Sequence, residues 1–221
     1  MKIRAFSALI DGFDTKVLAD ANFVAIHSNC AIDPDLLGLE QVSAAVHGAT
    51  SCLGAMTSDG ITDGIGVFAI EDPDGAYGTA MKPITHDAKS AARNATLAAL
   101  TNADRLGETP ELIWLSCTPG AEEEVVEGIE TVVGPDVPII GGSAADNDVS
   151  GGWFVYDREA KCTSGVIVTV MFPSGPVSFA YHNGYAPTDK AGTVTRVEGR
   201  RVLEIDNRPA FDVYREWTST N

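Results

Sequence analysis

The sequence is poor in basic residues, and this scarcity excludes several classes of partner. It has 15 Lys and Arg against 31 Asp and Glu, which gives a formal net charge of −16. A surface of this sign is repelled by nucleic-acid phosphates and by anionic lipid. We therefore expect no nucleic acid and no membrane as a partner. The plainest role of the charge is solubility, and recruitment of a basic partner is the alternative.

Cysteine is also scarce, and no apolar run approaches the length of a transmembrane helix. The four cysteines are scattered and form no Cys-x-x-Cys pair: Cys30, Cys52, Cys117 and Cys162. Their spacing argues against a zinc site and against a disulfide framework. The first residues lack the apolar core of a signal peptide. We expect a cytoplasmic protein with reduced thiols, no bound metal and no cofactor.

Motifs of nucleotide-binding and hydrolytic enzymes are missing too. The sequence contains no Gly-x-x-x-x-Gly-Lys-Ser/Thr and no Gly-x-Ser-x-Gly. Residues 64–69 match Gly-x-Gly-x-x-Ala, but these glycines enter an apolar strand. A dinucleotide site needs them in a turn between a strand and a helix. The sequence therefore favours a non-catalytic protein.

What the sequence does contain is a series of short apolar runs separated by turn signals. The runs 23–26 and 112–115 are typical of strands buried on both faces. Further strands are predicted over 3–10, 65–70, 77–81, 137–140, 153–156, 165–172, 177–181, 194–198 and 202–205. Helices are predicted from Asp33 and over 86–106, 121–133 and 208–217. We expect two hairpins, 65–70 with 77–81 and 153–156 with 165–172.

The order of these elements predicts an α/β fold of mixed sheets with helices packed on their faces. A strand, a helix, a strand, a glycine loop and a hairpin follow one another from Phe23. The same series recurs from Leu112, roughly ninety residues later, which we interpret as an internal duplication. Coincidence is the alternative, because units of this kind resemble one another.

Two glycine-rich loops are the features most informative about function. In the loop over 138–148 an apolar strand breaks into Gly141, Gly142 and Ser143, and Asp146 follows. Paired glycines let another group approach the main chain closely. The loop over 46–54 is a rougher copy. If the chain is duplicated, both loops follow equivalent strand ends, where ligands of open α/β sheets bind.

Backbone donors, a hydroxyl and a carboxylate in one small space suit a zwitterion such as an amino acid. The candidate ligand-binding residues are Thr50, Ser51, Cys52, Gly141, Gly142, Ser143 and Asp146. A tight turn held by an Asx bond of Asp146 is the alternative. A calcium site is disfavoured, because such a loop needs more alternating oxygens and a closing Glu.

Two other functions stay open. An enzyme would use Cys52 or Ser143 as nucleophile, with His47 or His182 as a base brought near by folding. The plainer interpretation is that Cys52 packs as a small apolar residue, and that His27 and His47 are hydrogen-bonded structural residues. A protein-interaction module would dock a partner through Phe211, Tyr214 and Trp217, which otherwise pack on the domain's own core.

An ordered set of segments resembles the N-terminal FIST domain, named for F-box and intracellular signal transduction proteins. The matching segments are 47–51, 59–60, 120–125, 138–146, 184–187, 204–206, 209–210 and Tyr214. The resemblance implies a non-catalytic sensory domain over 1–221 that binds small ligands such as amino acids. It also implies a downstream C-terminal FIST domain, absent from this chain, or a signalling protein as partner.

The sequence departs from the family pattern in two places. Asn207 stands where the family often has Gly, and Asn tolerates the left-handed conformation that such a turn needs. The loop over 52–56 lacks the acidic residue that many members carry after their glycines. This second departure weakens any transfer of ligand identity.

Overall fold

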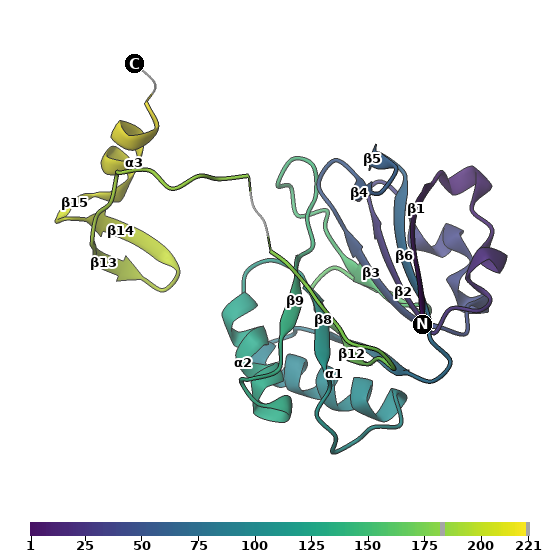
Figure 1. Cartoon of the computed structure of the whole chain (residues 1–221). Coiled ribbons are helices and arrows are strands. Elements are labelled where there is room, and N and C mark those ends of the chain that lie inside the picture. The colour runs from purple at the N-terminus through teal and green to yellow at the C-terminus, as the bar shows by residue number, and fades with distance from the viewer. Residues whose placement is uncertain (182–183, 220–221) are drawn as a thin grey trace. The chain divides into compact units, whose positions relative to one another are not determined.

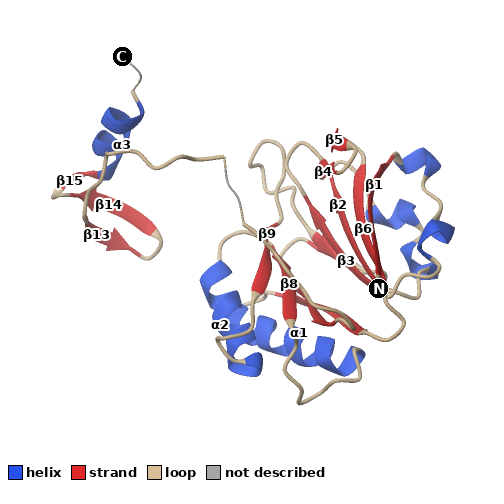
Figure 2. Cartoon of the chain, in the orientation of Figure 1, coloured by secondary structure: helices blue, strands red, loops and turns tan. Residues whose placement is uncertain are grey.

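The computed structural model describes residues 1–181 and 184–219. It divides the chain into two compact units, Met1–Ser178 and Phe179–Asn221. Helices and mixed sheets both occur, which confirms the α/β class (Figure 2). A single domain over 1–221 stays a prediction. In the described part of the chain, no helix has the length and apolar character that crossing a bilayer requires.

Two mixed sheets form the first unit (Figure 1). The first sheet has the order β1 (Lys2–Ala8), β6 (Ile65–Glu71), β2 (Phe23–Ser28), β3 (Ala45–Thr50), β10 (Val155–Tyr156), β11 (Lys161–Cys162). The second sheet has the order β7 (Ala76–Pro83), β12 (Gly165–Phe172), β8 (Leu112–Cys117), β9 (Ile139–Ser143). A separate two-stranded ribbon consists of β4 (Ala55–Thr57) and β5 (Gly60–Thr62).

The sheets repeat one topology, so an internal duplication is present, although the helix from Asp33 and the hairpins assigned to the repeated unit are wrong. The orders β1-β6-β2-β3 and β7-β12-β8-β9 correspond strand for strand. In each, two antiparallel pairings precede one parallel pairing, β2 with β3 and β8 with β9. Val24 pairs with Val46 as Ile113 pairs with Ile139. This register makes Thr50 the counterpart of Ser143, and Gly48 the counterpart of Gly141.

Both predicted hairpins are wrong. β6 and β7 belong to different sheets, and so do β10 and β12. A turn signal reverses the chain, but it does not decide which strand edge receives the next strand. The crossing between β6 and β7 is held by Asp72, whose Oδ2 accepts hydrogen bonds from the Tyr77 hydroxyl at 2.8 Å and from the Ser174 N–H at 2.9 Å.

Two helices cover the outer face of the second sheet, as predicted. They are α1 (Ala88–Asn102) and α2 (Glu122–Val133). Asp87 caps α1 by accepting the Ser90 N–H at 2.9 Å. The alanine face of α1 lets the sheet approach closely, since a Cβ added at Gly78 would lie 2.1 Å from the Ala99 carbonyl oxygen. The core on this side is therefore built from small helical residues and β-branched strand residues.

The α-helix predicted from Asp33 is wrong, because the segment forms 3-10 turns instead. Asp33 does act as an N-cap with Pro34 at the first helical position. The segment forms two short 3-10 turns, η3 (Pro34–Leu37) and η4 (Leu39–Gln41). Gly38 between them has φ 64°, a left-handed conformation that ends the first turn. Two further 3-10 turns are η1 (Ile10–Gly12) and η2 (Thr15–Leu18).

An aromatic and aliphatic layer fills the space between the two sheets. Phe23, Tyr77, Leu112 and Met171 are buried in it. The rings of Phe68 and Trp114 stack with centroids 5.5 Å apart. Because β2, β8 and β12 are covered on both faces, they appear in the sequence as nearly continuous apolar runs.

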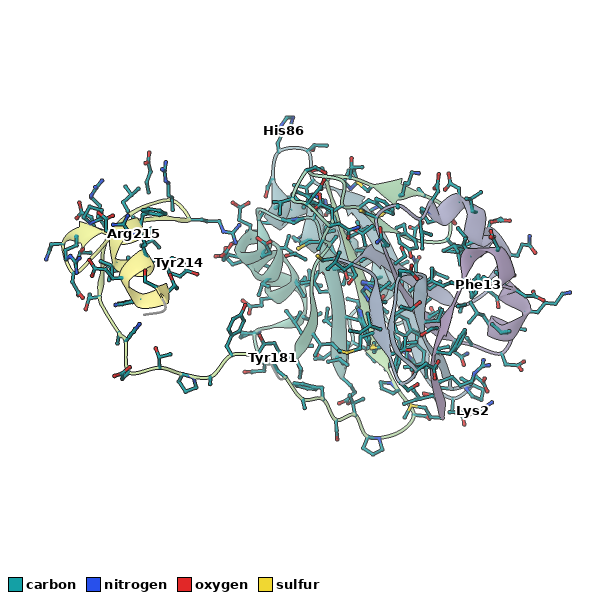
Figure 3. All side chains as sticks on the ribbon, turned by 90° about the horizontal axis from the view of Figure 1, so that it is seen from above. Lys2, Phe13, His86, Tyr181, Tyr214 and Arg215 are labelled. Carbon is teal, nitrogen blue, oxygen red and sulfur yellow. The ribbon has the colours of Figure 1, made fainter. Side chains whose placement is uncertain are left out.

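The second unit contains the predicted terminal strands and helix. They are β13 (Val194–Glu198), β14 (Arg201–Ile205), β15 (Arg208–Pro209) and α3 (Ala210–Thr218). Asn207 has φ 61°, which confirms that asparagine takes the left-handed turn. Tyr214 and Arg215 lie on α3 (Figure 3), and Arg215 covers the Phe211 ring at 5.9 Å. The strand predicted over 177–181 is wrong, since these exposed residues form no regular element.

Candidate functional site

The two glycine loops meet in the structure. The Ala145 N–H donates to the Thr50 carbonyl oxygen at 3.0 Å. The Leu53 N–H donates to the Asn147 side-chain oxygen at 2.7 Å. The predicted loops begin too early, since residues 46–50 belong to β3, and Gly141, Gly142 and Ser143 belong to β9. The segments that meet are the continuations of these two equivalent strands, residues 50–54 and 144–148. The region that the sequence singled out is therefore one continuous hydrogen-bonded seam.

Thr50 holds this seam together from inside. Its side chain is buried, and its Oγ1 accepts the Phe154 N–H at 3.1 Å. In return its own N–H donates to the Phe154 carbonyl oxygen at 3.0 Å. These bonds use the hydroxyl within the protein, so Thr50 positions the loops and is not presented to a ligand.

Ser143, the counterpart of Thr50, lies in a different environment. It is exposed, and its hydroxyl donates to Glu122 Oε1 at 2.7 Å. The Glu122 carboxylate also accepts the Gly120 N–H at 3.2 Å. Sequence reasoning placed Glu122 only at a helix start. A signal was present, because Glu122 begins the helix that joins the parallel strands β8 and β9, and the start of such a helix lies beside the carboxyl ends of both strands.

Ser143 and Glu122 lie at the rim of an open hollow of about 470 Å³. The glycine pair and Ser143 line one side, and α2 lines the other. Its apolar lining includes Leu115, Val126, Val137 and Ile139. The hollow thus combines carboxylate, hydroxyl and main-chain groups with an apolar wall.

The paired glycines have different roles. Gly141 has φ 140°, and a Cβ added there would lie 1.8 Å from the Leu115 carbonyl oxygen. Gly141 is therefore required by the sheet itself. Gly142 has no atom within 4 Å of an added Cβ and has no positive φ. The fold therefore does not need glycine at 142.

Asp146 shapes its own loop. Its carboxylate accepts the N–H groups of Val149 at 2.8 Å, Gly151 at 2.7 Å and Gly152 at 2.8 Å. Desolvation raises the pKa of this carboxyl, and the three backbone bonds outweigh it, so the net shift is downward. Because the loop's own backbone occupies the carboxylate, the structure favours the turn interpretation over ammonium binding.

The remaining predicted residues lie elsewhere. Ser51 lines a second hollow of about 170 Å³, together with His27 and Phe68. This hollow and the one beside Ser143 share no lining residue. Cys52 is exposed and lines neither of the two. The predicted set is therefore divided among a structural clasp, two hollows and the open surface.

The comparison with protein families is decisive for the class. The FIST N domain family matches residues 28–208, which is most of the chain. The chain belongs to the FIST N domain family. Membership confirms the resemblance drawn from the sequence, and it supports a sensory role in signalling.

Comparisons with individual proteins add less. An uncharacterized protein, MJ1623 of Methanocaldococcus jannaschii, is 36% identical over 107 residues. The match covers 45% of this chain and 19% of that protein. A crystal structure of cyanuric acid hydrolase from A. caulinodans aligns with a TM-score of 0.42 and 10% identity. It covers 78% of this chain and 67% of that one, and a likeness of this degree carries no information on function.

In this FIST N domain, His47 is a structural residue, as the sequence predicted. It is fully buried on β3 and reaches across to the second sheet. Its Nδ1 lies 2.9 Å from Thr169 Oγ1, and its Nε2 lies 3.0 Å from Ser116 Oγ. Thr169 Oγ1 in turn lies 2.6 Å from Thr79 Oγ1. Both ring nitrogens of His47 thus belong to a hydrogen-bonded chain between the sheets. The other candidate base, His182, lies outside the described residues.

We expect the FIST N domain to lose stability as pH falls below about 6.5. Burial lowers the pKa of His47 well below its ordinary value of 6.5, and the nearby His27 lowers it further. Burial also lowers the pKa of His27, against a bond to the Ala49 backbone that raises it. The unfolded chain then binds more protons than the folded chain. Each histidine can contribute a slope of about 1.4 kcal/mol per pH unit.

The measurement is urea unfolding between pH 7 and pH 5. This range lies above the region in which most carboxylates titrate. A free energy of unfolding that stays constant across the range would contradict the assignment of both histidines as buried and neutral.

Within residues 1–181 and 184–219, no group of three or more His, Cys, Asp or Glu side chains is placed to hold a metal ion.

Proposed function

We propose that this domain senses a small polar, amino-acid-like ligand and signals to a partner protein or a downstream domain. The proposal rests on one observation: two equivalent glycine-rich segments are hydrogen-bonded to each other beside an open hollow. Family membership supports the signalling role. The domain acts by binding rather than by catalysis.

The hollow beside Ser143 has the chemistry for a zwitterion. Glu122 offers a carboxylate for an ammonium group, in the role that the sequence assigned to Asp146. Gly142 and Ser143 offer a main chain without a bulky side chain and a hydroxyl for the ligand carboxylate. Val126 and Val137 form an apolar wall for the ligand's side chain.

The hydrogen bonds between the two segments offer a route by which ligand binding could change the structure. A ligand that binds Glu122 competes with the Ser143 hydroxyl for the same oxygen. Ser143 is followed by Ala144 and then by Ala145, whose N–H bonds to Thr50 in the other loop. Binding therefore biases the seam between two arrangements, provided that the ligand has different affinities for them.

The test is a thermal-shift screen of the chain against amino acids, small carboxylates, nucleotides and divalent metals. A ligand bound only by the folded state raises the melting temperature in step with RT ln(1 + [L]/Kd). We expect a concentration-dependent rise with an amino acid. Each of three variants, Glu122→Gln, Ser143→Ala and Gly142→Val, should weaken binding, so that the apparent Kd obtained from this rise increases at least tenfold.

The matched control is Glu124→Gln, which removes the same charge from the exposed side of the same helical turn. Equal losses in Glu122→Gln and Glu124→Gln would show a general charge effect and would remove Glu122 from the site. A flat screen would overturn the proposed ligand class.

Protein interaction is the second candidate function. Phe211 and Tyr214 are 72% and 62% exposed in the second unit, where Val213 is buried. Exposed aromatic side chains in a small unit are typical of surfaces that dock another protein. An enzyme using Cys52 has less support, because within the described residues no hydrogen bond joins the Cys52 thiol to a base.

A further inference from the structure

The strand β7 combines two properties that rarely occur together. Among the described residues it is an edge strand, since β12 is its one neighbour in the sheet. Yet Tyr77 and Ala80 are only 9% and 8% exposed. An edge strand normally lies at the surface, where charge, proline or a covering segment protects it from pairing. The edge of β7 instead faces a groove.

The register shows which main-chain groups of β7 face this groove. The Ile84 N–H donates to the Ser164 carbonyl oxygen at 2.8 Å, just beyond the pair of Pro83 and Gly165. In an antiparallel pair such bonds alternate along the strand. The main chain of residues 78, 80 and 82 therefore faces β12, and that of Tyr77, Thr79 and Met81 faces away.

An independent contact supports the conclusion that Thr79 faces away from β12. The Asn102 side chain of α1 donates to the Thr79 carbonyl oxygen at 2.8 Å, on the side away from β12. Pro83 lacks an N–H, so it ends the row of outward-facing donors. The N–H groups of Tyr77, Thr79 and Met81 remain directed at the groove.

The groove has a volume of about 600 Å³. Residues 77–82 form one wall, and residues 43–46 with the turn 157–159 form the other. β10 pairs with β3 only at Gly48 and Ala49, and the Thr50 N–H points toward β10. By the same alternation the main chain of Val46 faces the groove as well. Two strands therefore present main-chain groups to one space.

We propose that this groove binds an extended peptide segment of a partner protein, which adds to β7 as a further strand. Six lining residues of β7 span about 20 Å at roughly 3.3 Å per residue, the length of an ordinary strand. Main-chain hydrogen bonds supply the affinity in this mode of recognition. The segment satisfies donors that otherwise rely on water.

Charge defines the chemistry of the partner segment. Four charged residues line the groove: Lys82 on β7, and Asp157, Arg158 and Glu159 on the other wall. Arg158 pairs with Glu159 at 3.6 Å, and Asp157 accepts the N–H groups of Glu159 and Ala160. Lys82 has no ion pair with a carboxylate within the described residues. The complementary segment is therefore an extended peptide with an acidic side chain placed to meet Lys82.

The test uses a fluorescein-labelled peptide, Thr-Val-Thr-Val-Glu-Val with blocked ends, and fluorescence anisotropy with the whole chain. We expect saturable binding, with amide shifts at Tyr77, Thr79 and Met81 in NMR spectra. A peptide N-methylated at alternate residues keeps the side chains but cannot pair as a strand. It should bind at least tenfold more weakly.

Met81→Pro removes one outward N–H without touching the ladder to β12. Met81→Ala is its matched control, because it removes the same side chain but keeps the N–H. We expect at least a tenfold loss for Met81→Pro, little loss for Met81→Ala, and a severalfold, salt-sensitive loss for Lys82→Gln. If Met81→Pro fails to fold, comparing the plain peptide with the N-methylated peptide still tests, on the unmodified chain, whether binding needs main-chain hydrogen bonds.

Four outcomes would overturn the proposal. They are no binding at millimolar peptide, equal binding of the N-methylated peptide, equal losses in the two Met81 variants, and concentration-dependent dimers that Met81→Pro abolishes. The last outcome would identify the occupant as a second copy of the chain. A failure here leaves the ligand hollow beside Ser143 untouched, since the two sites share no lining residue.

Discussion

Gly141→Ala should lower the free energy of unfolding by about 3 kcal/mol or more, whereas Gly142→Ala should change it by less than about 0.5 kcal/mol. The added methyl at 141 would lie 1.8 Å from the Leu115 carbonyl oxygen, which belongs to the sheet and cannot rotate away. The φ of 140° adds backbone strain for any L side chain. At 142 neither penalty exists.

Urea unfolding of both variants with the parent chain measures this difference. The two sites are adjacent and the substitutions are chemically identical, so the pair controls for a general effect of replacing glycine. Similar stabilities for the two variants would contradict the placement of Gly141 against Leu115. If Gly142→Ala is stable, its ligand affinity tests the proposed role of Gly142 without a loss of folding.

His47→Leu should lower the free energy of unfolding by about 2 to 4 kcal/mol. Leucine fills most of the space but leaves the buried Ser116 hydroxyl without its partner, and leaves the Thr169 hydroxyl with Thr79 alone. An abandoned buried hydroxyl costs about 1 to 3 kcal/mol, and the lost hydrogen bond to Thr169 adds about 1 kcal/mol. The substitution should also flatten the dependence of stability on pH between 7 and 5, because one of the two buried titrating groups is gone.

His86→Leu is the control for this second prediction. His86 is exposed (Figure 3), so the same replacement there should leave both the stability and its pH slope nearly unchanged. The pH slope separates the interpretations, since a mere packing defect at 47 would lower stability without altering the slope. An unchanged slope in His47→Leu would assign the acid sensitivity to other groups, His27 first.

The contact between the two glycine-rich segments was predictable from the sequence, whereas the hydrogen-bond partners of the nearby carboxylates were not. Glycine pairs at strand ends are a local signal, and the duplication in the sequence indicated that the two loops correspond. Asp146 and Glu122 show the limit. One carboxylate bonds to three N–H groups of its own loop, and the other meets Ser143 from 21 residues away. Residue types alone do not distinguish a carboxylate used by its own backbone from one at the rim of a hollow.

Several features were determined by the sequence alone. Period and apolar content specified most of the strands of both sheets, both long helices and the terminal helix, because these patterns depend on neighbours within one or two turns of chain. The repeated order of elements indicated the duplication but assigned two wrong hairpins to it. The FIST resemblance was carried by short ordered motifs, which need no tertiary information.

Only the tertiary structure decided which edges pair. β6 and β7 are joined by a clear turn yet enter different sheets, and β12 lies between β7 and β8 although they precede it in the chain by many residues. Strand pairing depends on which edges are free once the other strands are in place, and a local pattern does not contain that information. The same long-range packing separates Gly141 from Gly142, buries His47 among three hydroxyl residues, and turns the edge of β7 toward a groove.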